Sequence, residues 1–79
     1  MRYTDLLPDP PASRDARSRV RWAVNVLNEV RVKKRPPEAL AILWQTIIGW
    51  TDICPPADVK PYRALAVLVR EAEKRLKSK

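Results

Sequence analysis

The residues best suited to chemistry in this chain are arginines that recur at helical spacing. Arg14, Arg17 and Arg21 are separated by three and four positions, so a helix would align them on one face. None of the three has an acidic residue three or four positions away. Guanidinium groups bind phosphate oxygens through two parallel hydrogen bonds. This spacing predicts a surface, named here the arginine stripe, that binds phosphates or another acidic partner.

Further polar and basic residues extend the arginine stripe toward the middle of the chain. Asn25 lies on its flank, where the amide could reach sugar or base edges. A second basic cluster, Lys33, Lys34 and Arg35, directly precedes a Pro-Pro step. A plain alternative is a solvated helix face followed by cations that suit the negative end of the helix dipole. The net charge of +7 and the pI of about 10.2 are compatible with both interpretations.

Enzymatic catalysis has little support in the sequence. The chain has no histidine, one glycine and nine scattered acidic residues, so it offers neither the usual general base nor a glycine-rich phosphate loop. Its one cysteine, Cys54, lies between an isoleucine and two prolines, without a base nearby in sequence. We therefore expect a protein that is not an enzyme, with no catalytic residue, no metal site and no cofactor.

Four large apolar residues fall outside the expected core faces and indicate a second kind of surface. They are Trp22, Ile42, Trp50 and Val67. Tryptophan is enriched in the hot spots of protein interfaces, and a small core with surplus apolar surface favours association. The alternative function is therefore a protein–protein interaction module, an adaptor or small inhibitor, that docks on an acidic partner surface and self-associates as a homo-oligomer.

Prolines divide the chain into the elements that must position these residues. Three Pro-Pro steps, Pro10-Pro11, Pro36-Pro37 and Pro55-Pro56, allow helices to begin but not to continue through them. The sequence predicts an extended proline-rich arm over residues 1–12 and a single three-helix domain over residues 13–79. The helices are expected at about 13–32, 37–51 and 60–76. The predicted fold class is all-α, a small three-helix bundle.

Hydrophobic periodicity supports these helices and suggests a core. The first helix, expected to be the longest, has an apolar face that leaves Trp22 on its polar side. The second is apolar around most of its circumference, which predicts the central position in the bundle and makes Trp44 a core residue. The best core candidates are Leu27, Leu40, Leu43, Ile47, Leu65 and Val69.

Length and composition indicate where such a protein acts. Seventy-nine residues make one domain. The longest uncharged stretch, residues 39–51, is shorter than the roughly 20 residues needed to span a bilayer. One cysteine suits a reducing compartment, and no secretory h-region is apparent. We expect a cytoplasmic protein whose function is to contact the backbone of DNA or RNA, as an accessory subunit of a larger assembly.

Overall fold

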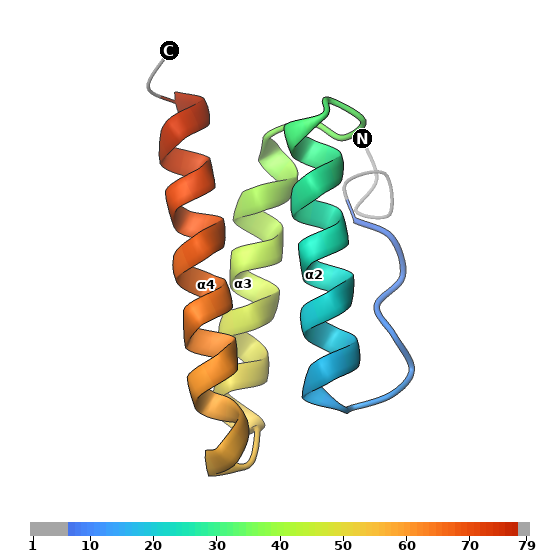
Figure 1. Ribbon diagram of the computed structural model, residues 1–79, viewed down its shortest axis with the longest axis vertical. Helices are drawn as coiled ribbons and strands as arrows, with labels where there is room; N and C mark the ends of the chain where they lie inside the picture. The colour runs from blue at the N-terminus through green and yellow to red at the C-terminus, as the bar shows by residue number, and fades with distance from the viewer. Residues whose placement is uncertain (1–6, 78–79) are drawn as a thin grey trace.

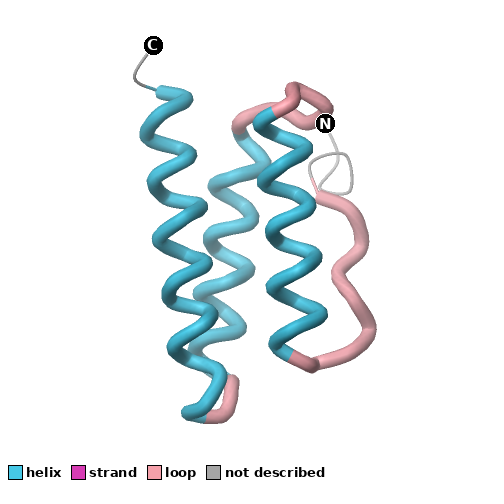
Figure 2. Tube along the Cα trace, in the orientation of Figure 1, coloured by secondary structure: helices cyan, strands magenta, loops and turns pink. Residues whose placement is uncertain are grey.

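Three antiparallel helices form the computed structural model of the chain, which describes residues 7–77 (Figure 1). They are α2 (Ala16–Arg31), α3 (Glu38–Ile53) and α4 (Pro56–Lys77), and no strand occurs among the described residues (Figure 2). The predicted fold class, a small all-α three-helix bundle, is confirmed. None of these helices combines the length and apolarity that crossing a bilayer requires.

Helix α2 begins and ends on local signals. Asp15 is its N-cap, and one carboxylate oxygen accepts a hydrogen bond of 3.2 Å from the backbone N–H of Ser18. After Arg31 the chain turns through Lys33, which has a φ of 65°. The N–H of Lys34 donates to the carbonyl of Glu29 at 2.8 Å, and the N–H of Lys33 donates to Val30 at 3.1 Å. This pair of bonds is a Schellman motif, in which the left-handed position normally holds glycine.

Helix α4 begins earlier than the sequence suggested. It starts at Pro56 instead of near residue 60, because proline is well accommodated in the first turn of a helix. Pro61 lies inside it, beyond the first turn, so its missing N–H removes one helical hydrogen bond. With 22 residues against 16 for α2, α4 is the longest helix. The expectation that the first helix would be the longest is therefore wrong.

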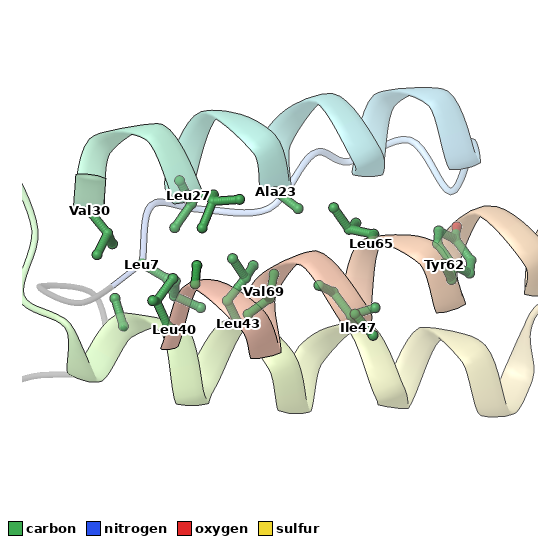
Figure 3. Close-up of a cluster of buried hydrophobic side chains, with 14 residues drawn as sticks. Leu7, Ala23, Leu27, Val30, Leu40, Leu43, Ile47, Tyr62, Leu65 and Val69 are labelled. Carbon is green, nitrogen blue, oxygen red and sulfur yellow. The ribbon is translucent and has the colours of Figure 1, made fainter. Parts of the chain in front are cut away.

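The core runs along the axis of the bundle (Figure 3). All six core candidates named from the sequence are buried, as are residues that the sequence analysis left out, among them Val26 and Ala66. Trp44 is only half-buried, because it lies at the edge of the α3–α4 contact beneath the guanidinium of Arg70. Its assignment to the core is corrected to a position on the rim.

The helices do not pack around α3 as expected. Helix α3 packs most extensively against α4, and α2 contacts α4 more than it contacts α3, so α4 is the helix that both others share. The outer side of α3 carries the exposed residues Ala41, Gln45 and Gly49. Small residues such as Ala41 count as apolar on a helical wheel although they need not be buried, and this is why the pattern suggested a central helix.

A non-helical segment leads into the bundle. Residues 7–15 run beside α2 (Figure 1), and Leu7 at their start is 2% exposed and belongs to the hydrophobic core. Residues 1–6 of the predicted arm lie outside the described residues. The segment therefore contributes a side chain to the core although it contains no helix.

Candidate nucleic-acid interface

The arginine stripe lies on the outer face of α2. Arg14 precedes the helix, Arg17 and Arg21 lie in its first two turns, and Asn25 follows one turn later. All four side chains are exposed. Within residues 7–77, the guanidinium groups of Arg14, Arg17 and Arg21 have no hydrogen bond or ion pair with a protein group. Their donors are available to a ligand.

The nearby carboxylates are occupied elsewhere. Asp15 uses one oxygen to accept the N–H of Ser18, and the Ser18 hydroxyl lies 3.5 Å from the same oxygen. Glu29 accepts a hydrogen bond from Nε of Arg35 at 3.0 Å. Neither acid therefore forms an ion pair with Arg14, Arg17 or Arg21.

A shallow hollow of about 270 Å³ lies on the arginine stripe. It is lined by Arg17, Ser18, Arg21, Trp22 and Asn25. Two guanidinium groups, a hydroxyl and an amide thus surround one opening beside an indole ring. The guanidinium and amide donors of this set suit the oxygens of a phosphate group, whereas the Ser18 hydroxyl donates to Asp15.

The second basic cluster divides into two parts. Lys33 and Lys34 are exposed in the loop after α2, at the opposite end of the helix from Arg14. Arg35 is partly buried and bonded to Glu29. Its guanidinium ties the loop back to α2, so Arg35 is less accessible to a ligand than the two lysines.

An aromatic cluster joins the three helices beneath one edge of the stripe. The ring centroids of Trp22 and Trp50 are 5.7 Å apart, and those of Trp50 and Tyr62 are also 5.7 Å apart. The guanidinium of Arg19 lies 4.9 Å from the Trp50 ring and donates to the Tyr62 hydroxyl at 3.5 Å. Sequence spacing does not reveal these aromatic partners of Arg19, because they lie more than 30 positions away along the chain.

The sequence suggested that Trp22 faces away from the other helices. In the structure it packs against Trp50 of α3 instead. The buried face of α2 is rotated toward Val26, which lies one turn after Trp22 and is fully buried. Trp22 itself is half-buried, and its indole N–H is enclosed without an acceptor among the described residues. The helical wheel had placed Trp22 among polar residues because the expected apolar face left out Val26, which is fully buried.

The four predicted interface residues do not form one patch. Trp22, Ile42 and Trp50 are half-buried and packed against the core, while Val67 on α4 is 56% exposed. Its neighbour Leu68 is 47% exposed. The structure thus places Trp22 and Trp50 together and offers Val67 and Leu68 as a separate apolar surface.

The remaining candidate for chemistry is Cys54, at the end of α3. Its thiol donates a hydrogen bond to the carbonyl of Thr51 at 3.5 Å. No group of three acidic, cysteine or histidine side chains gathers within the described part of the chain.

No protein-family model, curated protein or solved structure shows significant similarity to this chain.

Proposed function

We propose that this protein is a non-enzymatic module that binds the backbone of nucleic acid through the arginine stripe, as an accessory subunit of a larger assembly in the cytoplasm. The observation that carries the proposal is the exposure of Arg17 and Arg21 on one face of α2, and of Arg14 just before the helix, without an acidic partner. Like charges at helical spacing repel each other by a few tenths of a kcal/mol per pair. Phosphates would relieve this repulsion and accept the guanidinium hydrogen bonds.

Other exposed residues extend the contact surface. Lys33 and Lys34 add charge at the far end of α2, and the Asn25 amide lies between the two basic regions. Arg35 supports the surface indirectly, because its ion pair with Glu29 keeps that carboxylate away from the ligand.

Fluorescence anisotropy with labelled DNA and RNA tests the proposal. The variant Arg14→Ala/Arg17→Ala/Arg21→Ala should bind at least about 100-fold more weakly at 100 mM salt, since each phosphate contact adds roughly eight-fold through counterion release. The matched control, Lys60→Ala/Arg63→Ala/Arg75→Ala, removes the same charge from exposed positions on α4 and should change affinity about three-fold or less. Equal losses in the two variants would show that net charge alone drives binding, and would contradict the assignment to the stripe.

A protein–protein interaction module, acting through self-association, is the second candidate function, favoured by the adjacent exposed side chains of Val67 and Leu68. Sedimentation velocity at increasing protein concentration tests it. If α4 mediates association, Val67→Glu should shift a dimer to a monomer while Ala41→Glu, at an exposed alanine on the outer side of α3, shifts it less. A protein that stays monomeric at the highest concentration would exclude self-association through this face.

A further inference from the structure

We infer that α2 docks in the major groove of duplex DNA, with its two basic ends on the two phosphate backbones and its central amides over the base edges. This inference deepens the proposed function and rests on it. It names the class of nucleic acid and the face of α2 that would contact it.

The order of side chains along α2 is the first observation. Arg17 and Arg21 occupy its first half, Asn25 and Asn28 follow, and Arg31 ends it. All five are exposed, and their spacing keeps them on one side of the helix. The face therefore runs from cationic through neutral amide to cationic.

The length of this face matches the groove. Arg17 and Arg31 are 14 positions apart, which corresponds to about 21 Å along a helix axis. The major groove of B-DNA is about 12 Å wide and accommodates an α-helix. A helix that crosses the groove obliquely would place its basic ends near phosphates on both sides. Asn25 and Asn28 would then lie over base edges, where asparagine pairs with the N6 and N7 atoms of adenine.

The aromatic residues argue against a single-stranded ligand. Single strands are held mainly by bases stacked on free aromatic faces. Among the described residues, Trp22 packs on Trp50, Trp50 also contacts Tyr62, and Trp44 lies under Arg70. None of the three tryptophans is fully exposed. Duplex RNA fits less well, because its major groove is too deep and narrow for side chains to read.

Anisotropy with three ligands of matched length tests the class of nucleic acid: duplex DNA, single-stranded DNA and duplex RNA. We expect duplex DNA to bind at least about ten-fold tighter than either of the others. With six contributing cations, namely Arg14, Arg17, Arg21, Arg31, Lys33 and Lys34, the logarithm of the affinity should fall with the logarithm of salt at a slope of about −5.

Selection from a pool of random duplexes tests the amides. The wild-type protein should enrich adenine-containing sites, and Asn25→Ala/Asn28→Ala should lose that enrichment. Gln45→Ala, which removes an exposed amide from α3, is the matched control and should retain it. Thermal melting of each variant separates loss of contact from loss of fold.

The outcomes are distinguishable. Binding to none of the three ligands would overturn the proposed function itself. Equal binding of single strands or of duplex RNA would leave that function standing and overturn docking in the groove. An adenine preference that survives in the asparagine variant, or no preference in the wild type, would overturn the reading of bases by Asn25 and Asn28.

Discussion

Replacing Lys33 by glycine should stabilise the fold. Lys33 holds the left-handed position of the Schellman motif at the end of α2, with a φ of 65°. Its Cβ lies too close to the following carbonyl oxygen in this conformation, which costs an L-residue about 1–2 kcal/mol. Glycine lacks the Cβ and adopts the same backbone without this clash. Both hydrogen bonds of the motif come from backbone atoms, so the substitution leaves them in place.

The size of the effect is a difference between two terms. Relief of the left-handed strain contributes about 1–2 kcal/mol. The greater freedom of glycine in the unfolded chain offsets about 0.4–1 kcal/mol. The net gain for Lys33→Gly is therefore about 0.8 kcal/mol, within a range of about 0–1.6 kcal/mol, and the central value raises the melting temperature of a domain this small by roughly 3–6 °C.

Urea and thermal unfolding followed by circular dichroism at 222 nm measure this gain. Lys34→Gly is the matched control, because it removes the same side chain and charge from the next position, where φ is not positive. It should destabilise the protein by a few tenths of a kcal/mol to about 1 kcal/mol. If Lys33→Gly is as destabilising as Lys34→Gly, the strain assigned to Lys33 is absent and the reasoning fails.

Substitutions at three further positions test the packing. Leu7→Ala should cost about 2–4 kcal/mol in urea unfolding, because the side chain is 2% exposed within the core; a cost below about 0.5 kcal/mol would mean that this segment is not docked. Trp22→Ala should lower the free energy of unfolding of the isolated monomer by about 2 kcal/mol, because the contact with Trp50 is lost. An unchanged unfolding midpoint would mean that Trp22 does not stabilise the monomer and is available to an interface. Arg19→Ala should lower the free energy of unfolding by about 1 kcal/mol, because the cation–π contact with the Trp50 ring is lost. Arg19→Lys keeps a cation at this position and should lose less.

The fold was predictable because strong signals agreed. Proline steps bounded the helices, and long apolar residues at helical spacing, such as Leu43 and Ile47, identified the core. What the sequence could not provide was the packing between helices. Small residues made α3 look central, and the rotation of α2 toward Val26 depends on which neighbour it meets. The burial of Leu7 was missed for the same reason, since a single leucine among prolines carries no periodic signal.

The candidate site was predictable in part. The positions of Arg17 and Arg21 on an exposed face follow from spacing alone, because helical geometry aligns them regardless of tertiary contacts. The expected alignment of Arg14 by the same helix is wrong, because α2 begins at Ala16, after the N-cap Asp15. The partners of Arg19 and Arg35 do not follow from spacing. Arg19 reaches Trp50 and Tyr62 on other helices, and Arg35 folds back to Glu29 only because the Schellman motif reverses the chain.

The cluster of Trp22, Trp50 and Tyr62 gives the protein a built-in optical probe. Each ring comes from a different helix, so fixed contact among them requires all three helices to be docked. Near-ultraviolet circular dichroism responds to fixed aromatic packing and is lost in loosely packed states. Val30 and Leu40 lie at the opposite end of the core from Tyr62 (Figure 3). Opening at that end would leave most of the aromatic signal intact, so hydrogen exchange would be needed to observe it.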